Sequence, residues 1–132
     1  MNELVPISPA ALWSGRILSG LVVTFLLFDG FIKLIPLDVV IDTSRQLGIP
    51  TGLAFTLGIL TLVCTFLYAY PRTSVPGAIL LTGYLGGAMY VHLRAGSPLF
   101  SHTLFGVYLG AMIWGGLWLR DERVRLIFPW RR

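Results

Sequence analysis

The sequence predicts an all-α integral membrane protein, a four-helix bundle with both termini in the cytoplasm. Hydrophobic residues make up 55% of the chain and charged residues only 12%, with a mean hydropathy of +0.78. This composition is far more apolar than that of a soluble domain of the same length. No charged residue lies between Arg45 and Arg72, between Arg72 and Arg94, or between Arg94 and Arg120. Each interval is long enough for a helix of roughly 20 residues to cross the hydrocarbon core.

We place the first transmembrane helix at residues 12–35. This segment is apolar apart from Arg16 near its start and the pair Asp29 and Lys33 near its end. Pro36 closes it, because proline cannot continue a helix. The residues before the helix lack the basic region of a secretory signal peptide, so we expect the helix to remain in the mature protein.

The other three helices are expected at residues 50–70, 75–93 and 98–119. Each begins at or beside a proline, a residue favoured in the first turn of a helix. The connection over residues 36–49 is the longest between helices, and its polar residues predict a solvated or interfacial loop. No segment is left for a soluble domain, so residues 1–132 are expected to form one membrane domain.

Basic residues gather on one side of this arrangement, which carries both termini and the connection between the second and third helices. The positive-inside rule therefore predicts cytoplasmic termini and a multi-pass protein of the bacterial inner membrane, in contact with membrane lipids. The net charge of +4 does not indicate a nucleic-acid partner, because the cations mark helix ends rather than one binding face. The residues on this side are Arg16, Arg72, Arg120, Arg123, Arg125, Arg131 and Arg132.

Six polar residues form a candidate ligand-binding site in the outer layer of the bundle. Ionisable residues within a span are costly and are therefore candidates for a functional site. Asp29 and Lys33 are four residues apart and share one face of the first helix. The topology brings the outer ends of the first, third and fourth helices to the same level, where a polar pocket would open. The six residues are Asp29, Lys33, Tyr84, His92, Arg94 and His102.

Two interpretations of the Asp29 and Lys33 pair remain open. In one, Lys33 reaches toward the interface and Asp29 neutralises it, so that the pair only holds the bundle together. In the other, the pair faces inward beneath a ligand, with Tyr84 and Tyr90 in the pocket wall. His92 and Arg94 are about 200° apart around a regular helix, so one is expected to face the pocket and the other the lipid headgroups.

No assembled catalytic or metal-binding set is visible. The serines are placed as helix caps and packing residues rather than in a strained nucleophile turn. His92, His102 and Asp29 are sparser than a typical metal-ligand set, and the two histidines lie near the same membrane edge, which does not suit a haem between them. Cys64 is the only cysteine, which excludes a dithiol. We therefore find no haem, metal or flavin motif, and we expect no catalytic activity of the chain on its own.

Glycines mark faces on which helices are expected to touch. Gly83 and Gly87 form one G-x-x-x-G motif, and Gly106 and Gly110 form another. Small residues let helix backbones approach closely inside a membrane. These faces serve either packing within the bundle or contact with another chain.

Six segments carry a resemblance over nearly the whole chain. They are Phe28-Asp-Gly-Phe-Ile-Lys-Leu, Leu57-Gly-Ile-Leu, Leu67-Tyr-Ala-Tyr-Pro-Arg-Thr, Gly77-Ala-Ile-Leu-Leu-Thr-Gly-Tyr-Leu-Gly-Gly-Ala, His92-Leu-Arg-Ala-Gly and Trp114-Gly-Gly-Leu-Trp-Leu-Arg-Asp. In these the sequence resembles the DoxX-like family of small bacterial four-helix membrane proteins. The resemblance implies four helices with cytoplasmic termini and draws attention to Lys33, His92 and Arg94. The chain departs from the pattern at Thr61, where the resemblance implies a glutamate in many relatives.

The resemblance also suggests two functions. Relatives include a membrane subunit of thiosulfate:quinone oxidoreductase and components of membrane-associated redox assemblies. Together with the polar cluster, this favours a subunit of a membrane redox system that binds a quinone or another lipophilic molecule in an outer-side pocket. The alternative is a non-catalytic accessory or assembly subunit that packs against other membrane protein subunits through its glycine faces.

Overall fold

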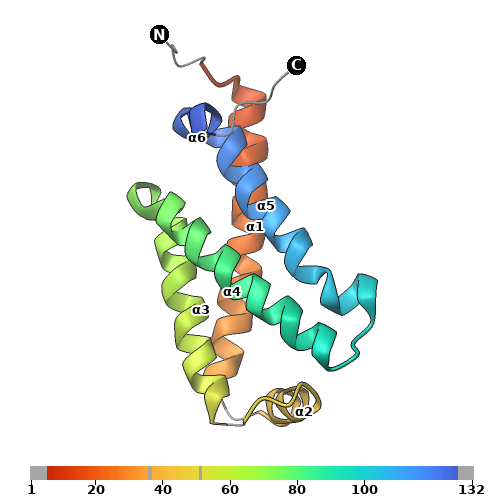
Figure 1. The fold of residues 1–132 in the computed structure, drawn as a ribbon. Helices are drawn as coiled ribbons and strands as arrows, with labels where there is room; N and C mark the ends of the chain where they lie inside the picture. The colour runs from red at the N-terminus through yellow and green to blue at the C-terminus, as the bar shows by residue number, and fades with distance from the viewer. Residues whose placement is uncertain (1–5, 36, 51, 128–132) are drawn as a thin grey trace.

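The structure, a computed structural model, describes residues 6–35, 37–50 and 52–127 (Figure 1). Within these ranges every regular element is helical. The α-helices are α1 (Pro9–Leu34), α2 (Asp38–Gln46), α3 (Leu53–Ala69), α4 (Ser74–Arg94), α5 (Phe105–Arg120) and α6 (Glu122–Ile127). A 3-10 turn η1 (Pro71–Thr73) precedes α4, and a π-helical turn η2 (Leu99–Thr103) precedes α5.

Three helical segments are long and apolar enough to cross a membrane. They are Pro9–Leu34, Pro71–Arg94 and Leu99–Arg120, and the apolar helix Leu53–Ala69 is shorter, with 17 residues. Seventeen residues is close to the lower limit for a transmembrane helix. The predicted all-α class is confirmed, and the chain is a multi-pass membrane protein with three long apolar helices and a fourth, shorter one.

The predicted helix boundaries agree with the structure at most ends. α1 starts earlier than expected because Ser8 caps it, accepting a hydrogen bond from the Ala11 amide at 3.2 Å, and Pro9 occupies its first position. The fourth predicted helix, 98–119, is not one regular helix, because its first turn is the π-helical η2 and the α-helix begins only at Phe105.

The prediction of a loop over residues 36–49 is wrong, because most of this connection is the helix α2. Asp38 in the first turn and Arg45 in the last complement the helix dipole. Val40 and Ser44, one turn apart, are buried. Gly48 ends the helix with a positive φ of 72°, a conformation that glycine adopts without steric cost. The exposed face of this amphipathic helix carries the polar residues Asp38, Asp42, Arg45 and Gln46.

α1 approaches its neighbouring helices most closely at glycines. A Cβ added to Gly15 would lie 2.7 Å from the Gly116 carbonyl oxygen of α5, and one added to Gly58 of α3 would lie 2.8 Å from the Gly30 carbonyl oxygen. Only glycine allows the backbones to approach this closely. These contacts fix α1 between α3 and α5, and α4 packs against the same two helices.

The predicted glycine faces behave differently. A Cβ added to Gly83, Gly87 or Gly110 would meet nothing within 4 Å, whereas one on Gly106 would meet the Met89 side chain at 2.7 Å. Gly106 therefore serves internal packing, in agreement with one of the two alternatives. Gly83 and Gly87 border open space. The prediction that they bring helices together within the bundle is therefore wrong for the part of the chain that the structure describes.

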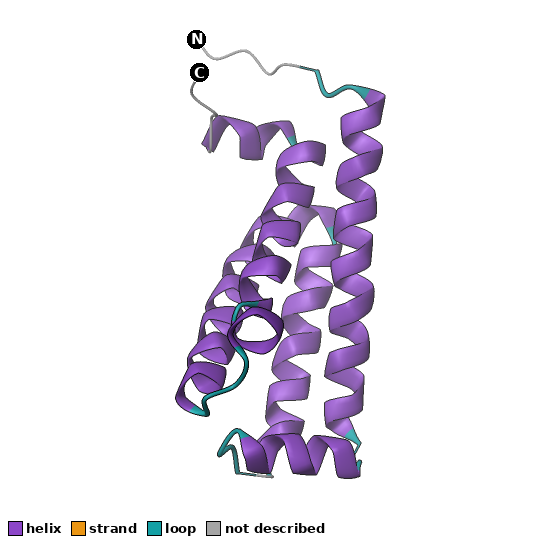
Figure 2. Cartoon of the chain, turned by 90° about the vertical axis from the view of Figure 1, so that its right-hand side faces the viewer, coloured by secondary structure: helices purple, strands orange, loops and turns teal. Residues whose placement is uncertain are grey.

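The helices separate toward one end of the bundle. α1 and α3 run side by side, while α4 starts beside the end of α3 and runs obliquely away from it (Figure 1). α2 lies crosswise below the ends of α1 and α3, as Figure 2 shows. The first turn of α1 and the short helix α6 are both at the opposite end of the bundle (Figure 1). The buried core lies between these ends and includes Val22, Leu26, Tyr68, Leu81, Ile113 and Leu117.

Candidate functional site

A cavity of about 530 Å³ lies at the α2 end of the bundle, between α1, α2, α3 and α4. Its walls are largely aliphatic, with Ile32 from α1, Val40 and Leu47 from the α2 side, Leu57 from α3 and Val91 from α4. A volume of this size is typical of small-molecule sites, which are mostly apolar with a few placed polar groups.

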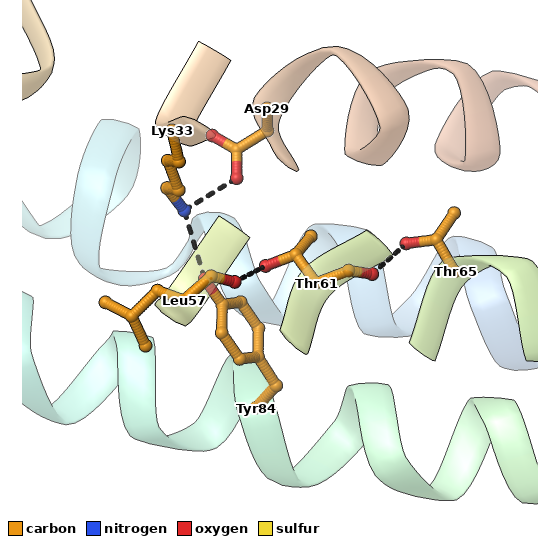
Figure 3. Close-up of polar contacts among 6 residues, drawn as sticks. All are labelled: Asp29, Lys33, Leu57, Thr61, Thr65 and Tyr84. Carbon is orange, nitrogen blue, oxygen red and sulfur yellow. Dashed lines mark hydrogen bonds and ion pairs between the residues drawn. The ribbon is translucent and has the colours of Figure 1, made fainter. Parts of the chain in front are cut away.

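The polar groups of the cavity centre on Lys33. Its Nζ donates a hydrogen bond to Asp29 Oδ2 at 2.7 Å and another to the Tyr84 hydroxyl at 3.0 Å (Figure 3). The exposed fractions of the Lys33 and Asp29 side chains are 25% and 29%, and all three residues line the cavity. Lys33 thus links α1 to α4 across the cavity, and Asp29 and Lys33 form an ion pair one helical turn apart.

The hydrogen-bonding capacity of this cluster extends beyond the contacts within it. An ammonium group has three N–H donors, and Lys33 uses two of them on Asp29 and Tyr84. The Tyr84 hydroxyl accepts from Lys33, which leaves its own hydrogen available for donation. The cluster can therefore offer two donors to one acceptor oxygen, and Asp29 Oδ1 can accept from a donor.

His92 also lines the cavity. Its Nδ1 lies 3.1 Å from the Ser97 hydroxyl. Ser97, one of the serines expected to cap a helix or to pack, contacts the imidazole and caps no helix. The cavity thus receives four of the six predicted site residues, two from α1 and two from α4.

The other two predicted residues lie outside the cavity lining. Arg94 Nη2 donates to the Leu47 carbonyl oxygen at 3.4 Å, so Arg94 contacts the end of α2 instead of facing the cavity. Arg94 and His92 thus face different directions around α4, as their spacing of two residues predicts. The His102 ring lies near the His92 ring, with centroids 5.9 Å apart and the planes tilted by 59°, and His102 Nδ1 lies 2.7 Å from the Ser101 hydroxyl. Tyr90, expected in the wall, is 64% exposed and does not line the cavity.

Sequence reasoning missed the contribution of α2. Val39, Val40, Thr43, Ser44 and Leu47 all line the cavity, which makes α2 its cover. Their spacing of one, four, five and eight residues is that of one face of a helix. This periodicity was the available signal, and the polar residues between these positions concealed it.

Sequence reasoning also missed that two glycines shape the cavity. Gly83 and Gly87 of α4 border it, and a Cβ on either would meet nothing within 4 Å. The missing side chains at these positions therefore contribute empty volume. The G-x-x-x-G spacing, expected to bring helices together, here keeps one face of α4 clear.

Position 61 carries no ionisable group in this chain. Thr61 is fully buried, and its hydroxyl donates to the Leu57 carbonyl of its own helix at 2.8 Å. Thr65 repeats the arrangement by donating to the Thr61 carbonyl at 2.7 Å (Figure 3). These hydroxyls are satisfied within α3, so the acid near the cavity is Asp29 of α1.

The cavity lining has the chemistry of a site for a small organic molecule. Within the described residues, no group of three or more His, Cys, Asp and Glu side chains is arranged to hold a metal. The cavity instead combines an aliphatic wall with the donors of Lys33 and Tyr84 and the imidazole of His92. This combination suits a lipophilic molecule whose polar head carries an acceptor oxygen.

Comparison with known proteins identifies the family of this chain. Residues 17–116 match the DoxX-like family, and the matched region includes α2, α3, α4 and the whole cavity lining. Neither the curated proteins nor the solved structures contain a match to the chain. On the family match, which covers more than half of its length, this multi-pass membrane protein belongs to the DoxX-like family.

Proposed function

We propose that this protein binds a lipophilic molecule with a carbonyl-bearing head group, such as a quinone, in the cavity covered by α2. In this proposal it is a subunit of a bacterial inner-membrane redox system, and a partner subunit supplies the redox group. One observation carries the proposal: the hydrogen-bonded cluster of Lys33, Asp29 and Tyr84 lines a largely aliphatic cavity of about 530 Å³.

Recognition of the head group follows from the hydrogen-bond inventory. A carbonyl oxygen has two lone pairs, and the remaining N–H of Lys33 and the O–H of Tyr84 can both be donated to it. Asp29 holds Lys33 in place and offsets its charge within the membrane. The cavity's aliphatic walls would receive the apolar part of the same molecule.

A glycine in the cavity wall provides a direct test. Gly87→Leu should fill the space that the glycine leaves open, because a Cβ at this position meets nothing within 4 Å. Gly86→Leu is the matched control, since its added Cβ also meets nothing within 4 Å and Gly86 does not line the cavity. Both variants and the wild type are purified in mild detergent, and the extracted lipophilic molecules are identified by mass spectrometry.

We expect a carbonyl-bearing lipophile to accompany the wild type and Gly86→Leu, and to fall at least about tenfold in Gly87→Leu, equivalent to about 1.4 kcal/mol. Equal amounts of the same molecules in all three proteins would contradict the proposal. A lipophile lost from Gly87→Leu that carries no carbonyl group would contradict the assigned head-group chemistry.

Glycines with open space beside them favour a second candidate, an accessory subunit that packs against a larger membrane complex. A Cβ on Gly110 or Gly115 of α5 would meet nothing within 4 Å, so this helix offers room for another backbone. Gly110→Leu should release partner subunits from the gently solubilised protein, while Asp29→Asn leaves them bound. A monomeric, partner-free wild type in mild detergent would exclude this function. Gly106→Leu is unsuitable for the test because of the contact with Met89.

A further inference from the structure

A second cleft, of about 260 Å³, lies at the opposite end of the bundle from the cavity. It is formed by α1, α3 and α5 and is lined by the side chains of Arg16, Ser19, Tyr68 and Arg120. Gly20 and Val23 of α1 extend the cleft toward the middle of the membrane span. The cleft thus has a basic outer part and an apolar inner part.

A chain of hydrogen bonds fixes Arg120 in this cleft. Tyr68 is fully buried and its hydroxyl donates to the Ile113 carbonyl at 2.8 Å. Because the Tyr68 hydrogen is used there, the 2.8 Å contact between the Ser19 and Tyr68 hydroxyls has Ser19 as the donor. Ser19 Oγ in turn accepts from Arg120 Nε at 3.0 Å. This buried network sets the guanidinium orientation before any ligand binds.

The close approach of α1 and α5 brings the two arginines to the same cleft. A Cβ on Gly15 would lie 2.7 Å from the Gly116 carbonyl oxygen and 3.0 Å from Arg120 Cβ. Arg16 follows Gly15 directly in α1, and its guanidinium lies 5.1 Å from the centre of the Trp13 ring. The helix crossing therefore places Arg16 beside the last turn of α5, where Arg120 lies.

Neither arginine has a carboxylate partner within the described ranges. There, the one ion pair is that of Lys33 and Asp29 at the other end of the bundle. Asp121, adjacent to Arg120, accepts a hydrogen bond from the Arg123 amide at 2.9 Å through Oδ1. Two guanidinium groups thus line a small cleft with no neutralising acid among the residues that the structure describes, which is an arrangement suited to an anion.

We infer that this cleft binds the phosphate of an anionic phospholipid, in the leaflet beside α6 and the start of α1. Arg120 and Arg16 would hold the phosphate by charge-assisted hydrogen bonds, and the apolar part of the cleft at Val23 would receive the start of an acyl chain. Trp13 lies at the same level, as expected for an interfacial position. Basic sites of this kind between transmembrane helices bind anionic headgroups on the cytoplasmic side. The inference does not depend on the cavity at the other end.

The test compares lipids and variants in neutral detergent. The purified protein is titrated with dihexanoyl phosphatidylglycerol, dihexanoyl phosphatidylcholine or inorganic phosphate, and binding is followed by native mass spectrometry and thermal stability. The double variant Arg16→Gln, Arg120→Gln removes both guanidinium groups of the cleft. Its matched control is Arg72→Gln, Arg123→Gln, which removes two exposed charges from the same end outside the cleft.

We expect phosphatidylglycerol to bind in preference to phosphatidylcholine and to bind about 30-fold more weakly to the cleft variant, since each basic residue contributes about 1 kcal/mol. The control should lose no more than a few-fold in affinity. Arg16→Gln alone, at an exposed position, should lose about fivefold, which keeps the test valid if the Arg120 substitution disturbs folding. Equal losses in the two double variants, or equal binding of both lipids, would overturn the inference. If inorganic phosphate binds as tightly as phosphatidylglycerol, the inferred phospholipid ligand is wrong and the cleft is a site for free phosphate.

Discussion

Substitutions of Asp29 and Lys33, singly and together, can distinguish a structural role of this ion pair from a role in ligand binding. Lys33→Met keeps an unbranched, apolar side chain but removes the ammonium group, and leaves Asp29 without its 2.7 Å partner. Asp29→Asn leaves Lys33 without its counter-charge. The double variant removes both charges at once, so a comparison of the three proteins measures the interaction itself.

The expected size of the effect follows from the position of the pair. An isolated charge at the centre of a span costs about 2.5–3.5 kcal/mol, and both side chains are partly exposed near the end of α1. We therefore expect each single variant to lose about 2 kcal/mol of unfolding free energy. Additive behaviour would give about 4 kcal/mol for the double variant, but we expect about 1 kcal/mol, mainly for the lost hydrogen bond to Tyr84.

Unfolding in mixed micelles of mild detergent and dodecyl sulfate, followed by circular dichroism, measures these free energies, and bound lipophile is quantified in the same preparations. A double variant that is nearly as stable as the wild type but has lost the lipophile would assign the pair to binding. Additive destabilisation would refute the coupling. A stable double variant that keeps the lipophile would exclude a role of the pair in binding.

Three further predictions concern the rest of the fold, and unfolding free energy checks the first two. Gly77→Ala should destabilise the protein by about 2 kcal/mol or more, because the added Cβ would collide with the backbone of Tyr68. Gly20→Ala is the control, since its added Cβ would meet nothing within 4 Å, and it should be neutral or stabilise the protein by up to about 1 kcal/mol. Tyr68→Phe should cost about 1 kcal/mol through its lost hydrogen bonds, and wild-type stability would contradict the network. Arg94→Gln should speed hydrogen exchange in α2 by removing its contact with Leu47, and unchanged exchange would exclude that role.

Much of the fold follows from the sequence because a membrane imposes strong constraints. Backbone groups in hydrocarbon must be satisfied within a helix, so long charge-free intervals predict helices directly. The first residue of a helix is harder to predict than its presence. Pro98 limits where a helix can begin, but the π-helical turn η2 follows it and the α-helix starts only at Phe105.

The candidate site was only partly predictable, for a different physical reason. Lys33 and Asp29 stand out because charges are rare in a span, and Tyr84 was expected only as part of the pocket wall. Its hydrogen bond to Lys33 depends on how α4 crosses α1. Gly87 looked like a packing residue, because the spacing of glycines does not reveal whether a neighbouring helix fills the space beside them.

Infrared spectroscopy of a bound quinone tests the central claim most directly. Decylubiquinone labelled with carbon-13 at one carbonyl or the other is added to the purified wild-type protein and to the double variant Asp29→Asn, Lys33→Met. We predict that one carbonyl band of the wild-type complex shifts to lower frequency, because that oxygen accepts hydrogen bonds from Lys33 and Tyr84, and that the double variant loses this shift. No binding by the wild type, or a bound quinone with the same carbonyl bands in both proteins, would contradict the claim that this cluster recognises the head group.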